Sequence, residues 1–268
     1  MGQMKFISFG SGSSGNCYYL GDGENAILID VGIGIRRLKK YLKEYGITCT
    51  ELKGIVITHD HADHVKASGY ISQELNLPVY TTMPIHDGIS RNIHTVKKIE
   101  AVNCHYIVPG EPFTIAGFTI TAFPIPHDST ENMGYKIEFG GKTFCIMTDV
   151  GEPTELVQTH IQVANYLVLE ANYDKEMLRN GKYPQMLKER IASGTGHLSN
   201  MQAAEALAQN FHENLRSVWL CHLSEENNHP ELARKTVEYH LRSFGIIAGK
   251  DFQLDVLHRL TPTGPFML

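Results

Sequence analysis

The sequence predicts a mixed α/β protein in which helices pack outside β-sheets. Three observations support this class. Short apolar runs rich in β-branched and aromatic residues recur along the whole chain. Segments with the 3.6-residue periodicity of amphipathic helices separate many of these runs. Hairpin turns dominate the first part of the chain, whereas strands and helices alternate later, so an all-parallel barrel is not expected.

The strand-like runs are short, and glycine, proline or polar residues bound most of them. We expect strands near residues 5–10, 17–20, 26–31, 54–58, 79–81, 105–108, 118–125, 134–139, 143–148, 166–170 and 217–222. Gly21-Asp22-Gly23 and Gly140-Gly141 supply residues that accept the backbone conformation of tight hairpin turns. The helical periodicity predicts helices near residues 34–45, 65–75, 84–92, 153–160, 184–192, 200–211 and 230–244.

The composition is that of an ordinary globular protein. The 268 residues are 42% hydrophobic and 20% charged, which excludes disordered and collagen-like chains. No apolar run reaches the roughly 18 residues of a transmembrane helix, and the N-terminus lacks the pattern of a secretory signal. No low-complexity linker or block of like charge divides the chain, so a single domain spanning residues 1–268 is expected.

The cysteines favour a reducing compartment. There are five, scattered along the chain and without a Cys-x-x-Cys pair, so neither a disulfide framework nor a cysteine-rich zinc module is expected. We therefore expect a cytoplasmic protein whose cysteines act as small hydrophobic residues. The histidines differ, because several of the 14 lie beside Asp in short polar clusters that follow apolar runs. Such clusters are where a metal site is expected.

The sharpest motif is His59-Asp60-His61-Ala62-Asp63-His64, which directly follows an apolar strand-like run. A solvated polar turn does not need three histidines in six residues. A loop of this kind can direct His59 and His61 to one metal ion while Asp63 and His64 serve a second ion nearby. Imidazole and carboxylate together suit Zn²⁺ and other first-row divalent ions.

This motif resembles the signature of the metallo-β-lactamase superfamily. The resemblance implies four further residues at the ends of strands, in a fixed order along the chain. The sequence supplies all of them, namely Asp30, His127, Asp149 and His222. Each of these residues alone is ordinary, whereas the ordered set is specific to the superfamily.

The resemblance implies a four-layer αββα sandwich with a dinuclear metal site on one edge. One divalent ion would be bound by His59, His61 and His127. The other would be bound by Asp63, His64 and His222. Asp149 would bridge the two ions, and Asp30 would orient the histidine loop without binding metal. Two neighbouring ions suit hydrolysis, and ligands of nitrogen and oxygen alone accept Zn²⁺, Mn²⁺ or Fe²⁺.

Several branches of the superfamily match the chain less well. True β-lactamases normally carry Cys where Asp149 stands and are exported, and the flavo-diiron branch usually has Glu in place of His61. Thioester hydrolases similar to glyoxalase II share the ligand set, but usually with fewer than the 73 residues that separate Asp149 from the last histidine here. The β-CASP nucleases insert a whole domain, for which the 48 residues between Asp149 and His197 leave no room.

The interval between the bridging Asp and the last His resembles the phosphodiesterase branch, which includes nucleases that process transfer-RNA 3′ ends. Glu170-Ala171 and His197-Leu198-Ser199 match two elements of that branch. The resemblance implies that Glu170 orients His197, and that His197 stabilises or protonates the leaving oxygen. Ser199 and Asn200 are candidate substrate contacts at a helix N-terminus, which attracts anions. Alternatively, they only cap that helix, and His197 is a surface residue.

Over nearly its whole length the chain resembles the YycJ/WalJ-like proteins. The match is carried by residues 9–17, FGSGSSGNC, and by residues 222–230, HLSEENNHP. It implies 5′→3′ exonuclease action on DNA, linked to mismatch repair. Ser13 and Ser14 can present hydroxyl and backbone N–H groups to phosphate, or they belong to a flexible hairpin turn. Asn227 is a further candidate contact, or it precedes the start of a helix.

The charge distribution gives mixed evidence about nucleic acid. The 24 Lys and Arg against 29 Asp and Glu give a net charge of −5, which is poor for a non-specific binder. Residues 175–190, however, carry five basic residues against two Glu, and two divalent ions would add further positive charge. Lys182 and Arg190 are therefore candidate contacts to a polyanion, although this segment can equally be a solvated helix face.

These observations predict a cytoplasmic, dinuclear metal-dependent phosphodiesterase, namely a DNA exonuclease. Asp63 would orient the attacking hydroxide, and His197, held by Glu170, would assist the leaving group. The alternative is a small-molecule hydrolase that acts on a cyclic phosphodiester or a glyoxalase II-like thioester. The intact ligand set disfavours a non-enzymatic metal-binding scaffold. DNA is the expected partner, repair-complex proteins are further candidates, and no membrane interaction is expected.

Overall fold

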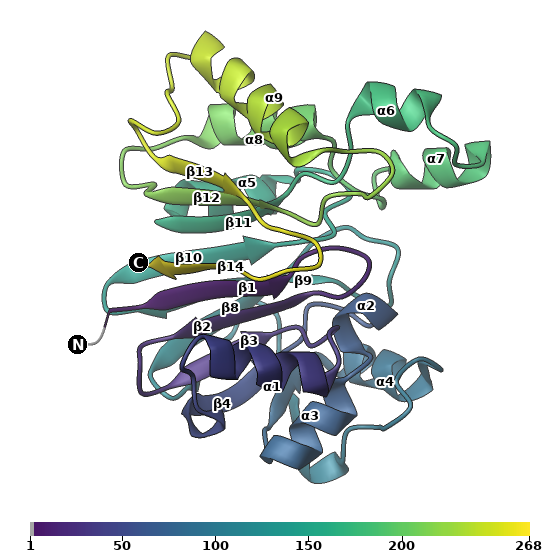
Figure 1. Cartoon of the computed structure of the whole chain (residues 1–268), viewed down its shortest axis with the longest axis vertical. Helices are drawn as coiled ribbons and strands as arrows, with labels where there is room; N and C mark the ends of the chain where they lie inside the picture. Colours follow the sequence, from purple (N-terminus) through teal and green to yellow (C-terminus); the bar gives the residue numbers. More distant parts are fainter. Residues whose placement is uncertain (1–2) are drawn as a thin grey trace. The chain divides into compact units, whose positions relative to one another are not determined.

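The computed structural model describes residues 3–268 and contains two seven-stranded mixed β-sheets with helices (Figure 1). The chain divides into two compact units. The first comprises Met1–Ala122, Ser129–Met133 and His258–Leu268, and the second comprises Phe123–Asp128 and Gly134–Leu257. The single domain remains a prediction, because the compactness of a unit does not establish whether it folds independently.

The first sheet has the strand order β14-β1-β2-β3-β4-β5-β6. Its strands are β1 (Lys5–Gly10), β2 (Cys17–Gly21), β3 (Ala26–Ile29), β4 (Leu52–Val56), β5 (Val79–Thr81), β6 (Cys104–Tyr106) and β14 (Thr263–Met267). β1, β2 and β3 pair antiparallel, as the predicted hairpins require, whereas β3 to β6 run parallel. The carboxyl ends of β3 and β4 therefore lie at the same edge, where Asp30 and the histidine loop follow them.

Helices connect the parallel strands of the first unit, because parallel pairing needs crossover connections. α1 (Ile35–Glu44) links β3 to β4, α2 (Ala62–Val65) and α3 (Ser68–Leu75) link β4 to β5, and α4 (Met83–Arg91) links β5 to β6. Short 3₁₀ turns occupy Cys49–Glu51 and Ala101–Asn103. In Figure 1, α1, α3 and α4 lie below β1 and β2. α1 buries Leu38, Tyr41 and Leu42, as expected of an amphipathic helix.

The second sheet has the strand order β13-β12-β11-β10-β9-β8-β7. Its strands are β7 (Pro112–Ile115), β8 (Phe118–Pro124), β9 (Met133–Phe139), β10 (Lys142–Met147), β11 (Tyr166–Glu170), β12 (Ser217–Cys221) and β13 (Gln253–Val256). β10 to β13 run parallel, and β9 pairs antiparallel with β10 across the predicted Gly140-Gly141 turn. The carboxyl ends of β10, β11 and β12 therefore bring Asp149, Glu170 and His222 to one edge.

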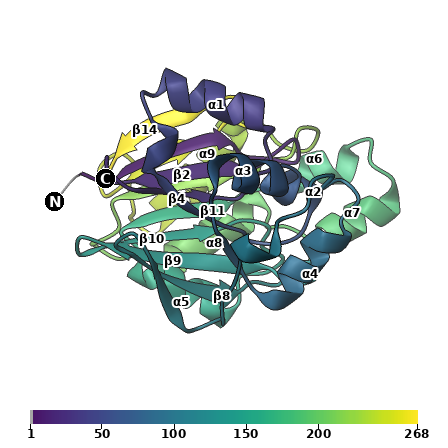
Figure 2. The same cartoon turned by 90° about the horizontal axis from the view of Figure 1, so that it is seen from below.

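The core of the second unit involves three helices, α5 (Glu155–Val163), α8 (Asn200–Asn210) and α9 (Pro230–Ser243). α5 contacts β10, α9 contacts β13, and α8 contacts both of these helices. The buried side chains include Leu167, Leu169, Val218 and Leu220 from strands and Val157, Ile161, Leu207 and Val237 from helices. α6 (Lys175–Asn180) and α7 (Gln185–Ile191) stand to one side of this core in Figures 1 and 2.

Most predicted elements agree with the structure, and the differences have physical causes. The helix predicted near residues 65–75 is interrupted at Lys66 and Ala67, so α2 and α3 are separate. The sequence patterns do not predict β7, β13, β14 or α6, because these are short and partly exposed elements. Within residues 3–268, no helix has the length and hydrophobicity to cross a bilayer.

Candidate metal centre

Three predicted site residues share an unusual backbone conformation. Asp30, Asp149 and His222 follow β3, β10 and β12, and their φ angles are +56°, +57° and +55°. A non-glycine residue with positive φ is uncommon, although Asp and His are among the residues that tolerate it best. Such conformations cost on the order of 1–3 kcal/mol and cluster at functional sites. Backbone strain therefore marks three positions that the resemblance selects by residue type.

In the first unit, the histidine motif forms a compact cluster at the end of β4. His59 and His64 are fully buried, and their ring centroids lie 4.0 Å apart. The ring centroids of His59 and His61 lie 4.8 Å apart. α2 begins directly after His61, so Asp63 and His64 belong to its single turn. The fold of this unit thereby gathers all four side chains of the motif.

Asp30 holds the histidine loop from the end of β3. Its buried carboxylate accepts hydrogen bonds from the Thr58 N–H at 2.9 Å and from His64 Nδ1 at 2.7 Å. This network assigns the proton of His64 to Nδ1, so the lone pair is on Nε2, where a metal ion would take the place of the Asn16 amide that lies 2.8 Å away. The geometry supports an orienting role for Asp30.

Asn16 also contacts this loop, although the sequence gives no signal for it. The Gly12 N–H donates to Asn16 Oδ1 at 2.8 Å and so fixes which side of the amide carries the nitrogen. Asn16 Nδ2 then lies 2.8 Å from His64 Nε2 and 3.2 Å from Asp63 Oδ2. The loop between β1 and β2 therefore supports the ligand side chains, and its Asn16 precedes Asp63 by 47 residues.

Gly32 allows the close approach of these loops, and its replacement tests their role. A Cβ atom at Gly32 would lie 1.5 Å from Asp63 O. We expect Gly32→Ala to displace Asp63 and the rest of α2. The substitution should cost about 1–3 kcal/mol of stability and should weaken metal binding. Gly34→Ala is the matched control, because apart from its neighbours in the chain no atom lies within 4 Å of its Cβ position. Thermal unfolding with and without added metal measures both effects, and equal behaviour of the two variants would contradict this prediction.

In the second unit, four further groups converge at the carboxyl ends of β10, β11 and β12. Single ligand atoms of the set lie within 4.8 Å of one another, and the set is Asp149, Glu170, His197 and His222. His222 Nδ1 lies 3.5 Å from Asp149 Oδ1. His127 Nε2 lies 3.7 Å from the same oxygen, and His127 Nδ1 lies 2.9 Å from Gly196 O. A histidine that donates from Nδ1 to a carbonyl presents Nε2 to a metal ion.

Glu170 organises more of this cluster than the sequence suggests. Its fully buried carboxylate accepts the N–H groups of Val150 at 3.0 Å and Leu198 at 2.9 Å. It also lies 2.9 Å from His197 Nδ1 and 3.1 Å from His222 Nδ1. Burial acts to raise the pKa of Glu170, but His197 and these hydrogen bonds hold that pKa below its usual value. The charged carboxylate therefore orients two histidines rather than His197 alone.

His197 lies beside two carboxylates, because its Nδ1 is 2.9 Å from Glu170 Oε1 and 3.7 Å from Asp149 Oδ1. Burial opposes its charged form, but Glu170 and Asp149 together raise the pKa of His197 above its usual value. Its Nδ1 bonds Glu170, so the proton on Nε2 is the one that can pass to a leaving oxygen. The His197 side chain is 18% exposed, which keeps it accessible to a substrate.

Three of the weaker substrate candidates have partners inside the second unit. Ser199 caps α8 in a capping box with Gln202. Asn200 is 1% exposed and exchanges two amide hydrogen bonds with Asn228, at 2.9 and 2.8 Å. Asn227 is fully buried, and its backbone O accepts the Asp174 N–H at 2.8 Å. These contacts favour structural roles for the three residues.

The remaining candidates are more accessible. Ser13 is exposed and Ser14 is half-buried in the loop before β2. Lys182 is exposed between α6 and α7. Arg190, at the end of α7, is paired with Asp128. Of the two basic candidates, Lys182 is the one without such a pairing among the described residues.

Comparisons with known proteins identify the family. The model of the beta-lactamase superfamily domain matches residues 25–222. The exodeoxyribonuclease YycJ of Bacillus anthracis is 31% identical over 260 residues, which cover 97% of both chains. The exodeoxyribonuclease WalJ of Streptococcus pneumoniae serotype 2 is 31% identical over 250 residues, which cover 93% of both chains.

Solved structures show the same fold. The metallo-β-lactamase fold protein YhfI of Bacillus subtilis superposes with a TM-score of 0.71 at 18% identity, over 98% of this chain and 99% of its own. Zn²⁺-bound PqqB of Methylobacterium extorquens gives a TM-score of 0.69 at 18% identity, over 97% and 100% of the two chains. These matches confirm the predicted fold class. Together with the family match and the two sequence relatives, they show that the chain belongs to the metallo-β-lactamase superfamily, among its YycJ/WalJ-like members, and is a metal-dependent hydrolase.

Proposed function

We propose that the protein is a two-metal phosphodiesterase that degrades DNA in the 5′→3′ direction, with a role in DNA repair. The observation that carries this proposal is the Glu170–His197 pair beside Asp149, because it adds a proton donor to a set of metal ligands. The names of the two relatives support DNA as the substrate, since each match covers at least 93% of this chain. The free state of all five cysteines fits a cytoplasmic enzyme.

We assign the metal ligands as the family pattern implies. In this assignment His59, His61 and His127 would hold the first ion. Asp63, His64 and His222 would hold the second ion, and Asp149 would be shared by both. A donor set of imidazole and carboxylate fits Zn²⁺, Mn²⁺ or Fe²⁺, and such ions, when bound, polarise the phosphodiester and lower the pKa of water.

The orientation of the histidines supports this assignment. The Nδ1 atoms of three of them have acceptors in their own unit, which are Asp30 for His64, Gly196 O for His127 and Glu170 for His222. In each ring Nε2 is therefore the nitrogen that would bind an ion. Partners of this kind raise the basicity of a ligand and fix its orientation before the ion arrives.

Three side chains act on the substrate or on each other. Asp63 accepts a proton from the attacking water, and His197 donates a proton to the leaving oxygen. Glu170 is a positioning residue that keeps His197 charged and correctly oriented.

A comparison of four substrates tests the proposal. Protein stripped of metal and reloaded with Zn²⁺, Mn²⁺ or Fe²⁺ is given end-labelled DNA, bis-p-nitrophenyl phosphate, a cyclic dinucleotide and a glutathione thioester. We expect stepwise shortening of DNA from its 5′ end and slower hydrolysis of the nitrophenyl ester. Hydrolysis of only the cyclic dinucleotide or the thioester would establish the small-molecule hydrolase instead. Metal binding without hydrolysis of any substrate would indicate a scaffold.

A further inference from the structure

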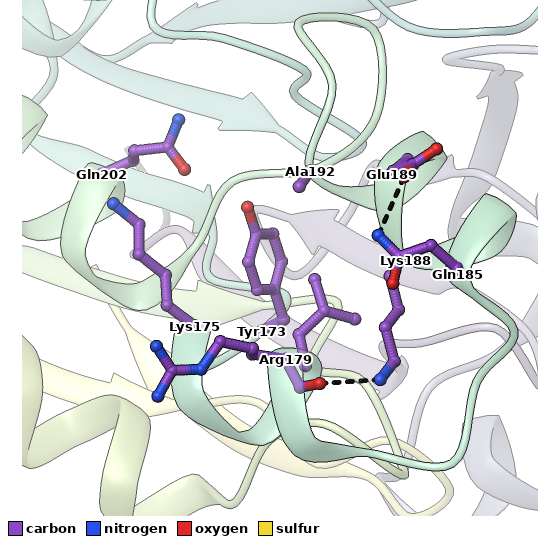
Figure 3. A pocket seen from close by; sticks show the side chains of 9 residues that line it. Tyr173, Lys175, Arg179, Gln185, Lys188, Glu189, Ala192 and Gln202 are labelled. Atoms are coloured by element: carbon purple, nitrogen blue, oxygen red, sulfur yellow. Dashed lines mark hydrogen bonds between the residues drawn. The ribbon is translucent and has the colours of Figure 1, made fainter.

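The second unit contains a pocket of about 400 Å³ bounded by α6, α7 and the first turn of α8 (Figure 3). Tyr173 and Leu178, each 4% exposed, contribute the edges of their side chains as apolar lining. Lys175, Arg179 and Lys188 supply three positive charges against the one negative charge of Glu189. Figure 3 shows Lys175 and Lys188 on opposite sides of the Tyr173 ring. The pocket therefore combines apolar surface with a positive lining.

The cations are held in different ways. Lys188 Nζ donates to Arg179 O at 2.7 Å, which leaves two of its three N–H donors for a ligand. Arg179 pairs with Glu176, which does not line the pocket. Gln185 donates to Glu189 at 2.8 Å and so engages the one carboxylate of the lining. Within residues 3–268, no acceptor bonds the ammonium group of Lys175, so Lys175 can bind an anion without breaking an existing pair.

The residues that line the pocket and the Glu170–His197 pair lie close together in two segments of the chain. Tyr173 follows Glu170 by three residues. Ala192, which lines the pocket, precedes His197 by five residues, and the His197 N–H donates to Ile191 O at 2.9 Å. Five residues span at most about 18 Å, whereas one strand of duplex DNA advances about 3.4 Å per nucleotide. The pocket therefore lies within a few nucleotides of any phosphate that His197 contacts.

We propose that this pocket is a nucleotide subsite for the DNA strand whose scissile phosphate lies at His197. A neighbouring phosphate lies between Lys175 and Lys188, and its base or sugar fills the pocket against the exposed edges of Tyr173 and Leu178. This inference rests on the proposed phosphodiesterase function. Small-ligand pockets have volumes of roughly 300–1,000 Å³, so the observed volume suits one nucleotide. Apolar contact combined with positive charge binds single strands without selecting their sequence.

The proposal assigns the contacts with DNA to Lys175 and Lys188, whereas the sequence suggests Lys182 and Arg190 in the same segment. Arg190 is paired with Asp128, and Lys182 does not line the pocket. Lys182 is therefore a matched control for Lys175, because both are exposed lysines of the α6–α7 region. Replacement of either lysine by Glu changes the net charge of that region by the same amount.

Binding of a single strand to the metal-loaded enzyme tests the subsite. The probe is a fluorescent oligothymidylate with phosphorothioate linkages, which resist hydrolysis, and its affinity is measured by anisotropy over a range of salt concentrations. We expect Lys175→Glu and Lys188→Glu each to weaken binding about tenfold and to reduce the salt slope by about 0.7. Lys182→Glu should change affinity less than about twofold.

Competition experiments separate a nucleotide subsite from a bare anion site. Thymidine monophosphate should displace the probe at much lower concentration than inorganic phosphate, and this difference should vanish in Lys175→Glu. Equal displacement by the two competitors would overturn the subsite, as would equal losses of affinity in the three lysine variants. Failure of the wild-type enzyme to cleave DNA would refute the proposed function, whereas the binding measurements would still decide whether the pocket takes a nucleotide.

Discussion

Asp149→Ala is expected to reduce the metal content of the purified protein from two ions to nearly none. Asp149 is 2% exposed, and its Oδ1 lies within 3.7 Å of nitrogen atoms of three histidines, His127, His197 and His222. Because one carboxylate serves both proposed ions, its loss weakens both sites together. Removal of an ordinary ligand would weaken only one of them. Elemental analysis after gel filtration measures the change directly.

Two further variants make this measurement specific. Asp149→Asn keeps a residue that tolerates the positive φ of this position, so it removes the charge with little backbone penalty. We expect it to lose most of the metal as well. Asp128→Asn is the control, because Asp128 Oδ1 lies 3.5 Å from His127 Nε2 but is not a proposed ligand. Retention of two ions by both Asp149 variants would refute the bridging assignment.

The strands that carry the site are predictable because each of them ends in a run of apolar residues. β3, β10 and β12 each end in a run of buried residues, which is typical of strands covered on both faces. Each strand is soon followed by a polar residue, which is easily recognised after an apolar run. These residues are Asp30, Asp149 and His222. The edge strands lack this contrast. β14, for example, contains Gly264 and Pro265, and it lies at the edge of the first sheet, where it pairs with β1.

The supporting contacts of the site are less visible in the sequence because they join distant residues. Asn16 reaches His64 across 48 positions, and Glu170 reaches His222 across 52. Neither pair produces a local pattern. The Glu170–His197 pair is predictable only because the resemblance to a known family places both residues in the interval between Asp149 and His222. The contact between Glu170 and His222 becomes evident only in the structure, where β11 and β12 pair in parallel and align their carboxyl ends.

The dual contact of Glu170 changes what its replacement should do. If Glu170 contacted His197 alone, Glu170→Gln would only lower kcat on DNA, and by less than the removal of His197 lowers it. The carboxylate also accepts hydrogen bonds from His222 and from two backbone N–H groups. We therefore expect Glu170→Gln to reduce metal affinity about 10–100-fold, the usual effect of losing a partner that orients a ligand, in addition to its effect on rate. His197 is thus the cleaner residue with which to test proton donation.

His197→Ala is expected to leave both metal ions in place and to lower kcat on DNA by about 10²–10⁴, the usual contribution of a general acid. His197 is not needed to complete the seven proposed ligands, and its Nδ1 bonds Glu170 rather than a ligand position. The defect should be smaller on bis-p-nitrophenyl phosphate, because nitrophenolate leaves readily without a proton. Single-turnover rates on the two substrates, with metal analysis of the same samples, measure this difference.

His197→Asn is the matched variant for this test. An Asn amide can still donate a hydrogen bond to Glu170, but it cannot release a proton to a leaving group. We therefore expect the rate on DNA to fall as far as in His197→Ala, while thermal stability stays closer to that of the wild type. If Asn restored the rate, His197 would act by positioning Glu170 rather than by donating a proton.

The double variant of His197 and Glu170 gives the final discrimination. Because the two residues act as one unit, His197→Ala combined with Glu170→Gln should lower kcat on DNA by little more than His197→Ala alone, once both proteins are saturated with metal. Additive losses would show that Glu170 acts on the reaction mainly through His222 and the metal ligands. Loss of a metal ion from His197→Ala would instead make His197 a ligand and would question the place of His222. If His197→Ala changed neither metal content nor DNA cleavage, the phosphodiesterase assignment would lose its most diagnostic residue, and the small-molecule hydrolase would become the better hypothesis.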